Sequence, residues 1–586
     1  MAGYRLWHQR DPERLKRERG AYHSAGLAFV LNEDLLRHKG LVAFGGEVVA
    51  AGIAYPLTVL YPPGFPFVRP EVISPTTQLS RHQHPYARNL CLIENSPAAW
   101  SSSMTGANMV QQAVRLLADS HSGPAAVHAN EVDAPEPRSV YYPYTAHSSL
   151  VIPENMQHMP SGSSGQAWLT GFDQAADARG LLNKLVMHEN GQQRVAEAPA
   201  GLRNLFSGAT MTGLWIKVDS APPWFGSYPV LRAWVKQQAP DFERRVRRLS
   251  SAPGNFGWNK ALEVLAVCYP EEGPARGEVH DTWLTAVRWE TNANRRGEQI
   301  LRPHLVTEQA RFVRTPQLAA LRGKRVAVIG LGTLGAEIAV RLGRAGVSTF
   351  YLVDYDLIEF GNQVRHESDL RDVGLPKVEV ITRRLHAINP YVRVESSAIR
   401  LGGFTDIGRP EEDVDQLGKF AANVCGYDLL VGATGDSKIN HLLNRIGQEL
   451  HVPLLYCWTM SGAWGGEVLR TLPGETACYE CMALQERDGM LSRVPQEDPV
   501  SREIFPLGCG FPTFTGAGFD TGSVALLATR LAVQTLLREH PDAYPDAPYH
   551  YLLWDSRGSG NGAWPDLYRW TIPRHPECSA CGAGRT

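Results

Sequence analysis

Two pairs of cysteines in the last part of the chain have the spacing of metal ligands. Cys478 and Cys481 form one Cys-x-x-Cys pair, and Cys578 and Cys581 form a second. Four thiolates are a common ligand set for a structural zinc ion, and two such pairs in one region are typical of a four-cysteine site. We therefore expect these residues to bind one Zn²⁺ ion. Two unrelated pairs of reduced thiols, or a redox-active pair, are the alternatives.

A glycine-rich loop precedes the cysteine pairs. The segment KRVAVIGLGTLGAEIAVRLGRAGVSTFYLVDYD predicts a strand, a turn, a helix and a second strand, and Gly330, Gly332 and Gly335 lie in the turn. Glycines allow a tight turn and leave the N–H groups of the helix N-terminus free to bind a phosphate. Asp354 ends the second strand, where it could accept hydrogen bonds from ribose hydroxyls. On its own, the loop fits an NAD-dependent dehydrogenase as well as any other nucleotide-binding enzyme.

Further polar residues follow this loop in a definite order. Asp356, Asn362, Arg365 and Lys377 come first, and Asp436 stands at the end of the predicted strand in YDLLVGATGD. With the two cysteine pairs, this order resembles the adenylating domain of ubiquitin-activating enzymes and of their bacterial relatives MoeB and ThiF. A dehydrogenase has no need for the arginine, the lysine and the distal zinc site together. Asp356 and Asn362 belong to the same motif, although either could instead cap or turn the chain.

The resemblance runs from about residue 324 to residue 581 and implies a reaction. Enzymes of this family attack the α-phosphate of ATP with a C-terminal carboxylate, so two anions must approach each other. Arg365 and Lys377 would neutralise the phosphates, Asp436 would hold Mg²⁺ across them, and Asp354 would bind the ribose. The resemblance therefore implies an ATP site formed by Gly330, Gly332, Gly335, Asp354, Asp356, Asn362, Arg365, Lys377 and Asp436.

Five of the nine cysteines remain outside the expected zinc site. Cys509 lies in the segment FPLGCGFPTFTGAG, and in the family a thiol at this position receives the adenylated carboxylate as a thioester. A loop thiol beside glycines is accessible and can be deprotonated near a helix N-terminus; the alternative is a simple loop cysteine. Cys268 and Cys457 lie in predicted strands, where core packing explains them, and Cys425 shows no pattern.

Cys91 lies in a second motif. The Pro-rich segment 61–66 is followed by His84-Pro, then by Asn89-Leu-Cys91, and Trp100 precedes a predicted helix. Residues 20–120 thereby resemble ubiquitin-conjugating enzymes, in which the cysteine of this motif carries a thioester. The resemblance implies that Cys91 is catalytic. The alternative is a packed cysteine in a small β domain.

One position departs from the pattern of that family. Ubiquitin-conjugating enzymes have an asparagine directly after His-Pro, which supports the oxyanion of the attacked thioester, and Tyr86 stands there in this chain. His84, Asn89 or backbone N–H groups would have to supply that support instead.

The elements that position these motifs divide the chain into three regions. Residues 1–140 predict an α+β domain of the ubiquitin-conjugating type, with an antiparallel meander in GLVAFGGEVVAAGIAYPLTVLYPP and a helix in GANMVQQAVRLLADS. Residues 141–310 predict an α+β region with strands such as GLWIKV and LEVLAVCYP, for which no role is assigned. Residues 311–586 predict a Rossmann-like α/β adenylation domain with the zinc site.

Composition narrows the classes of partner. The net charge is −2, hydrophobic residues make up 43% and charged residues 20%, so neither nucleic acid nor an anionic membrane is an expected partner. No apolar run approaches the ~18 residues that span a bilayer, and the charged N-terminus lacks a signal sequence. Nine cysteines, four of them assigned to zinc, suit a reducing cytoplasm.

Together the two resemblances describe a fusion of activating and conjugating domains. Such bacterial fusions occur in antiphage defence, where they attach a protein's C-terminal carboxylate to an amine. The expected partners are a ubiquitin-like protein or a nucleotidyltransferase and an amine-bearing target, with ATP, Mg²⁺ and Zn²⁺ as cofactors and a homodimer as the assembly. The alternatives are a sulfur-carrier adenylyltransferase of the MoeB/ThiF type, with an N-terminal domain that only binds, and a scaffold without activity.

Overall fold

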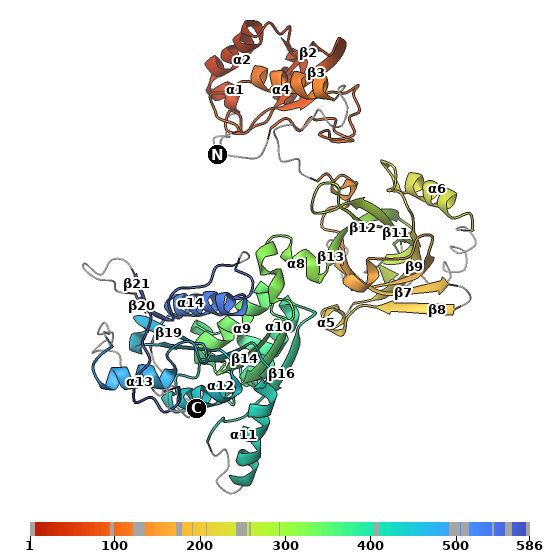
Figure 1. Ribbon diagram of the computed structural model, residues 1–586. Coiled ribbons are helices and arrows are strands. Elements are labelled where there is room, and N and C mark those ends of the chain that lie inside the picture. The colour runs from red at the N-terminus through yellow and green to blue at the C-terminus, as the bar shows by residue number, and fades with distance from the viewer. Residues whose placement is uncertain are drawn as a thin grey trace.

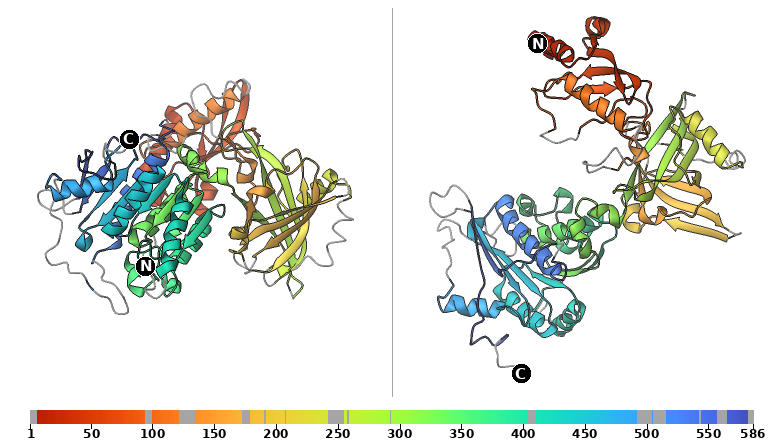
Figure 2. Two further views of the ribbon diagram at one scale, coloured as in Figure 1. Left: turned by 60° about the horizontal axis from the view of Figure 1, so that its bottom comes forward. Right: turned by 45° about the horizontal axis from the view of Figure 1, so that its top comes forward.

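The chain forms three bodies, each built around its own sheet. In Figure 1 the middle body lies between the N-terminal and C-terminal ones, and Figure 2 gives two further views. This computed structural model describes residues 6–93, 99–120, 135–171, 179–189, 192–206, 208–241, 255–256, 259–291, 293–403, 410–491, 504, 515–541, 544–556 and 565–581.

The N-terminal body is an α+β unit with a four-stranded antiparallel sheet in the order β1-β2-β3-β4. The expected meander is therefore confirmed. The helix expected after Trp100 is confirmed too, because Met109, Ala113 and Leu117 of α4 are buried in the core. The elements are α1 (Trp7–Arg10), α2 (Pro12–Ser24), β1 (Val30–Leu31), α3 (Glu33–Lys39), β2 (Val42–Ala50), β3 (Ile53–Tyr61), β4 (Glu71–Ile73) and α4 (Gly106–Asp119).

A buried carboxylate ties the helices of this unit to its sheet. Glu18 of α2 is fully buried. Its carboxylate accepts hydrogen bonds from the Tyr61 hydroxyl at 2.7 Å and from the Gly106 N–H at 2.8 Å. Arg14 pairs with the same carboxylate at 2.9 Å and donates to the carbonyl of Ser102. Since a buried charge is tolerated only when it is paired, this cluster fixes how α2, β3 and the start of α4 meet.

The middle body is mainly β and differs from the α+β unit expected there. Seven strands pair in a ring, in the order β11-β12-β13-β5-β7-β6-β9, and β9 pairs with β11 to close it. Closure leaves no free edge in the ring, and β8 and β10 add to it by pairing with β7 and β11. The strands are β5 (Ser149–Pro153), β6 (Ser164–Thr170), β7 (Arg179–Glu189), β8 (Gln192–Glu197), β9 (Thr210–Lys217), β10 (Asn255–Phe256), β11 (Asn259–Glu272), β12 (Val279–Glu290) and β13 (Arg296–Val306).

Both faces of this barrel carry buried apolar clusters, which explains why the middle body is built mainly from strands. One buried cluster takes residues from every strand of the ring and includes Trp215 and Trp283. A second cluster covers the opposite face of β9, β11, β12 and β13 and contains Leu231 and Val235 of α6 (Tyr228–Gln238). Within the described residues, α6 and the short α5 (Ala200–Arg203) are the α-helices of this body. Cys268 is fully buried, as expected.

The C-terminal body is a doubly wound α/β unit. Its eight-stranded sheet has the order β16-β15-β14-β17-β18-β19-β20-β21, parallel from β16 to β18 and antiparallel from β18 to β21. The Rossmann-like expectation is confirmed. The strands are β14 (Arg325–Ile329), β15 (Thr349–Val353), β16 (Arg393–Ser397), β17 (Leu429–Gly432), β18 (Leu454–Thr459), β19 (Gly465–Thr471), β20 (Tyr551–Asp555) and β21 (Asp566–Trp570).

Helices cover both faces of this sheet. One apolar cluster packs α9, α10 and α14 against it, and a second packs α12 and α13 together with the cysteine pairs. Cys457 of β18 is buried and Cys425 is exposed. No described helix combines the length and apolar character needed to cross a membrane. The helices are α8 (Glu308–Phe312), α9 (Thr333–Ala345), α10 (Lys377–Ile388), α11 (Pro410–Val424), α12 (Ser437–Leu450), α13 (Tyr479–Arg487) and α14 (Gly518–Leu536).

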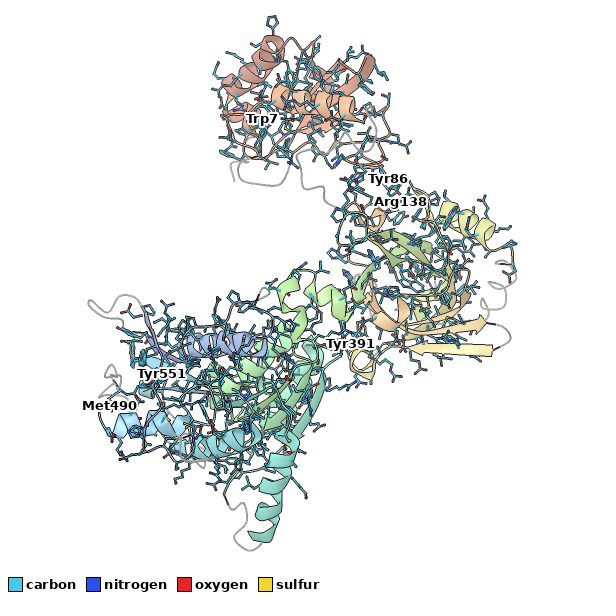
Figure 3. The ribbon with its side chains drawn as sticks, in the orientation of Figure 1. Trp7, Tyr86, Arg138, Tyr391, Met490 and Tyr551 are labelled. Atoms are coloured by element: carbon cyan, nitrogen blue, oxygen red, sulfur yellow. The ribbon has the colours of Figure 1, made fainter. Side chains whose placement is uncertain are left out.

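The barrel contacts both neighbouring bodies. Tyr86 of the N-terminal body and Tyr391 of the C-terminal body each lie at a junction with it (Figure 3). The Tyr391 hydroxyl donates to the carbonyl of Val306 at 2.5 Å and accepts from the N–H of Glu154 at 3.2 Å. The Tyr86 hydroxyl donates to the carbonyl of Phe225 at 2.8 Å.

Candidate active site

The glycine loop joins β14 to α9 and is fixed by close backbone contacts. Gly330 has a φ of +87°, which glycine adopts without strain. A Cβ at Gly330 would lie 2.7 Å from the carbonyl of Ala433, and one at Gly335 would lie 1.8 Å from the carbonyl of Gly330. Gly332 is the N-cap of α9 and makes no side-chain cap bond. Because Gly332 has no side chain to accept from them, the first N–H groups of α9 can donate to a phosphate.

Asp354 holds the glycine loop to the end of β15. One carboxylate oxygen accepts from the N–H of Leu331 at 2.6 Å, and the other accepts from the N–H of Asp356 at 2.8 Å. Burial raises the pKa of Asp354, while the charge of Lys377 and these two N–H groups act to lower it. Asp354 thus organises the loop through both of its oxygens.

Lys377 lies at the start of α10 and faces two carboxylates. Its ammonium is 2.8 Å from the Asp356 carboxylate, and only 12% of its side chain is exposed. Burial opposes the charge, yet Asp354 and Asp356 more than compensate, so the pKa of Lys377 is raised. A charged lysine is therefore held beside the glycine loop.

His366 is a member of this site that the sequence patterns did not single out. Its Nε2 lies 2.9 Å from the carbonyl of Leu331. Burial lowers the pKa of His366, so the neutral ring donates from Nε2 to the loop at neutral pH. In the sequence, its position directly after Arg365 could have indicated that it belongs to the site.

Arg365 and Asn362 connect the site to neighbouring segments. Arg365 donates to the carbonyl of Gly516, just before α14, at 3.4 Å, and burial lowers its pKa. The Asn362 side chain accepts from the N–H of Glu359 at 3.0 Å and so caps a turn; its role at the ATP site stays a prediction.

Asp436 follows β17, next to the glycine loop. The backbone of Thr434 lies 2.8 Å from where a Cβ on Gly330 would be. Asp436 is exposed and caps α12, accepting from the N–H of Lys438 at 2.9 Å. Because β14, β15 and β17 are parallel, their carboxyl ends share one edge, and the glycine loop, Asp354 and Asp436 meet there.

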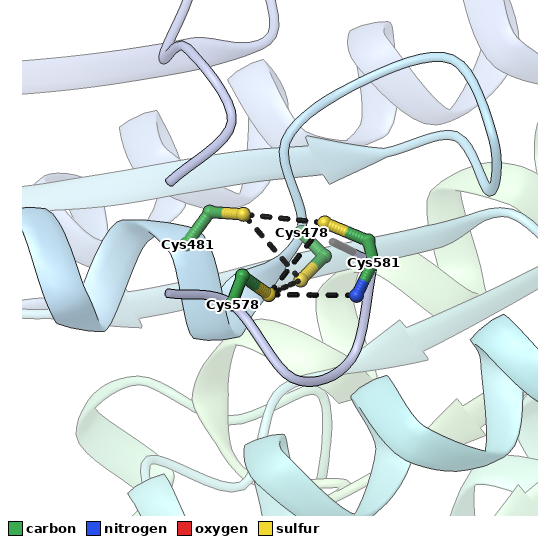
Figure 4. Close-up of side chains that lie close together, drawn as sticks. All are labelled: Cys478, Cys481, Cys578 and Cys581. Carbon is green, nitrogen blue, oxygen red and sulfur yellow. Dashed lines mark hydrogen bonds between the residues drawn. The ribbon is translucent and has the colours of Figure 1, made fainter. Parts of the chain in front are cut away.

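The four paired cysteines converge on one point, as Figure 4 shows. Their Sγ atoms are 3.2 to 3.9 Å apart in the closest pairs, and all lie within 4.8 Å of one another. A tetrahedral zinc ion with Zn–S bonds of about 2.3 Å needs S···S separations of about 3.8 Å. Asn444 also donates to the Sγ of Cys478 at 3.5 Å. The cluster fits a structural zinc ion that joins α13 to the tail after β21.

Cys91 is exposed, and it lies at the end of a tight loop. Its N–H donates to the carbonyl of His82 at 2.8 Å, and the His84 N–H donates to the carbonyl of Asn89 at 2.9 Å. The Nδ1 of His84 accepts from the N–H of Tyr86 at 3.2 Å. The described contacts of His84 and Asn89 thus shape the loop, and oxyanion support from either stays a prediction. Cys509 lies outside the described residues.

One comparison with known proteins covers almost the whole chain, and the others cover parts of it. Residues 306–559 match the model of the ThiF family. Uncharacterized protein y4oA of Sinorhizobium fredii is 26% identical over 99% of this chain and 98% of its own length. Ubiquitin-like modifier-activating enzyme 5 of Drosophila ananassae is 29% identical over 28% of this chain, and the match spans 40% of that enzyme.

A solved structure, Escherichia coli MccB with ATP, covers 47% of this chain and 74% of its own at 18% identity, with a TM-score of 0.34. The family match shows that the C-terminal part of the chain contains a ThiF/E1-like domain.

The glycine loop supplies a first prediction. Gly335→Ala should destabilise the C-terminal body by about 1–3 kcal/mol, because its Cβ would overlap the carbonyl of Gly330. Gly332→Ala is the matched control, since a Cβ there meets nothing within 4 Å. Thermal unfolding of both variants measures the difference. Equal midpoints for Gly335→Ala and wild type would contradict the packing described above.

The cysteine cluster supplies a second prediction. Purified protein should contain one zinc per chain, and Cys578→Ser should lose it together with several kcal/mol of folding free energy. Cys425→Ser, which alters an exposed cysteine outside the cluster, should keep the metal. Elemental analysis with thermal unfolding measures both effects, and metal-free protein of normal stability would rule out a structural zinc site.

Proposed function

We propose, from the ThiF/E1-like domain in its C-terminal part, that this chain uses ATP to activate the C-terminal carboxylate of a protein. Adenylyltransferase chemistry of this type is supported by the family match and by the relatives named ubiquitin-like modifier-activating enzyme 5. The activated group passes to Cys509, then to Cys91, and finally to an amine on a target. The proposed partner is a ubiquitin-like protein or a nucleotidyltransferase.

The observation that carries the proposal is the charge arrangement beside the glycine loop. Lys377 is partly buried and charged, and it lies against Asp356 at the carboxyl edge of the parallel sheet. A dinucleotide-binding loop needs no such lysine, whereas the approach of a carboxylate to a phosphate needs a fixed cation. Arg365 would add a second positive charge. Asp436 would hold Mg²⁺, which neutralises phosphate charge when bound.

Activation proceeds by displacement at the α-phosphorus of ATP. A carboxylate oxygen of the partner forms a bond to phosphorus while the bond to the β-phosphate breaks, and pyrophosphate leaves. In this step the N–H groups at the start of α9 and the ammonium of Lys377 offset the charge of the two anions. Asp354 keeps the loop in position throughout, because both of its oxygens are bound to backbone N–H groups.

Three acyl transfers follow in the proposed sequence. The Cys509 thiolate attacks the acyl carbonyl and AMP leaves, and then the Cys91 thiolate displaces Cys509. An amine finally attacks the thioester, a C–N bond forms, and the Cys91 sulfur leaves with a proton. In each transfer the acyl bond that forms has a hydrolysis free energy similar to, or smaller than, that of the bond that breaks, so no second ATP is needed.

The second candidate is a sulfur-carrier adenylyltransferase of the MoeB/ThiF type. It would share the ATP site, and its N-terminal body would only bind a partner. The exposed position of Cys91 at the end of a tight loop favours the conjugating role over this alternative. A homodimer formed through the ThiF/E1-like domain, and a role in antiphage defence, belong to the same proposal.

The adenylation step is tested by pyrophosphate–ATP exchange with a ubiquitin-like protein encoded beside the gene. Lys377→Ala should slow exchange by about 10²-fold, because a fixed cation next to the phosphates is lost. Asp436→Asn should slow it as well. Lys419→Ala, which changes an exposed lysine of α11, should exchange like wild type. Wild-type exchange in both site variants would refute the assignment of the ATP site.

The order of the two thiols is tested by following acyl adducts on gels without reductant. Cys91→Ala should accumulate an adduct on Cys509 that is sensitive to reductant, and it should form no final conjugate. Cys509→Ala should stop at the adenylate, and Cys425→Ala should behave like wild type. Normal conjugation by Cys91→Ala would reduce the N-terminal body to a binding module and put the sulfur-carrier candidate first.

A further inference from the structure

The loop that carries Cys91 is docked on the middle barrel. At its tip, the hydroxyl of Tyr86 donates to the carbonyl of Phe225 at 2.8 Å and accepts from the N–H of the same residue at 3.1 Å. The Tyr86 ring also meets Trp224 edge-on, with centroids 6.0 Å apart. Figure 3 shows Tyr86 and Arg138 at this junction. The loop is therefore held by the barrel as well as by its own domain.

A chain of hydrogen bonds runs from the barrel to Cys91. Glu272, the last residue of β11, accepts from the N–H of Glu136 at 2.6 Å and pairs with Arg81 at 3.1 Å. The Glu136 carboxylate accepts from the N–H of His82 at 3.0 and 3.1 Å. The carbonyl of His82 then accepts from the N–H of Cys91 at 2.8 Å. Two hydrogen-bonded steps thus separate Glu136 from the backbone of the thiol-bearing residue.

The Glu136 carboxylate also affects the pKa of the Cys91 thiol. Although the Cys91 side chain reaches solvent, the protein around its thiol desolvates it and raises its pKa; the charge of Glu136 raises the pKa further, and Arg69 opposes both effects. Tyr141 faces this site from the segment after Glu136, and burial together with Glu136 raises its pKa to about 12, so it stays neutral. Of the charged groups that act on the Cys91 thiol, the Glu136 carboxylate holds its pKa up, and the Nδ1 of His82 lies 3.2 Å from that carboxylate.

Glu136 is neither a solvated surface residue nor closed off. Its side chain is 18% exposed. It borders a cavity of about 470 Å³ between the two bodies, which Arg81, Glu271, Glu272 and Glu278 also line. A carboxylate of an ordinary linker would keep its water, because desolvation costs more than a single exposed ion pair returns. We therefore interpret Glu136 as a residue that acts on the Cys91 loop.

We propose that the middle barrel is a working part of the Cys91 site and that Glu136 is its positioning residue. Glu136 holds the Cys91 loop through the backbone of His82, and it places a negative charge beside the thiol. The inference rests on the proposed acyl-carrying role of Cys91 and adds to it the barrel, for which the sequence assigned no role. A thiol of higher pKa is a stronger nucleophile as thiolate and a slower leaving group. At neutral pH the charge lowers the thiolate fraction and so slows attack by Cys91, but it also makes the sulfur a slower leaving group and so favours a longer-lived thioester.

The charge is tested without any partner protein, by alkylating the full chain with iodoacetamide across a pH series. Mass spectrometry of the Cys91 peptide reports its rate separately from those of the other cysteines. Glu136→Gln keeps an oxygen that can accept from His82 but removes the charge, so the midpoint of the profile should move to lower pH. At pH 7.5 alkylation should be roughly two- to fivefold faster. Glu47→Gln, an exposed residue of β2, should match wild type.

The positioning role is tested with Glu136→Ala, which removes the hydrogen bond as well. Backbone amides of residues 82–91 should exchange hydrogen faster in this variant, while Glu136→Gln should keep wild-type exchange there. An unchanged alkylation profile in Glu136→Gln, or unchanged exchange in Glu136→Ala, would overturn the inference. Both readouts use the chain alone. They can therefore succeed even where thioester formation on Cys91 is not found, and that separate result would count against the proposed function.

Discussion

The candidate ATP site depends on the two hydrogen bonds that the carboxylate of Asp354 accepts from backbone N–H groups. One comes from Leu331 in the glycine loop, and the other comes from Asp356. The buried Leu331 side chain and the hydrogen bond from His366 to the Leu331 carbonyl hold the same loop. Asp356 in turn pairs with Lys377. A single partly buried acid thereby sets the position of the loop, of a second acid and of the partly buried lysine.

The zinc-type cluster and the glycine loop stabilise different ends of the same sheet. The loop sits where the parallel strands end, while the cysteines join α13 to the tail that follows the antiparallel strands. The cysteine pairs of α13 and of the tail are 100 residues apart in the sequence, so a metal ion that crosslinks them restricts the unfolded chain more than a local contact would. We interpret the cluster as structural, because the four thiols contact one another and leave no open ligand position.

The middle barrel connects the two proposed chemistries. It contacts the C-terminal body through Tyr391 and the Cys91 loop through Tyr86 and Glu272. Closure of the ring leaves none of its strand edges free to pair elsewhere.

Sequence alone determined the elements that follow from local patterns. The glycine spacing, the apolar run before it and the acid after the next strand specify a strand, a phosphate-type turn and a helix, because each is set by backbone geometry over a few residues. Cys-x-x-Cys spacing specified the ligand pairs for the same reason, and the apolar spacing of Met109, Ala113 and Leu117 specified α4.

Tertiary structure decided what depends on pairing between distant segments. The closed ring of the middle body required β9 to pair with β11, and no local pattern encodes that partner. Sequence patterns could not identify His366 or Glu136, because a lone histidine or glutamate belongs to no motif. Their roles arise from the Leu331 carbonyl and the His82 N–H, which folding brings close to them. The sequence specifies the type of each side chain, but tertiary packing determines which group that side chain contacts.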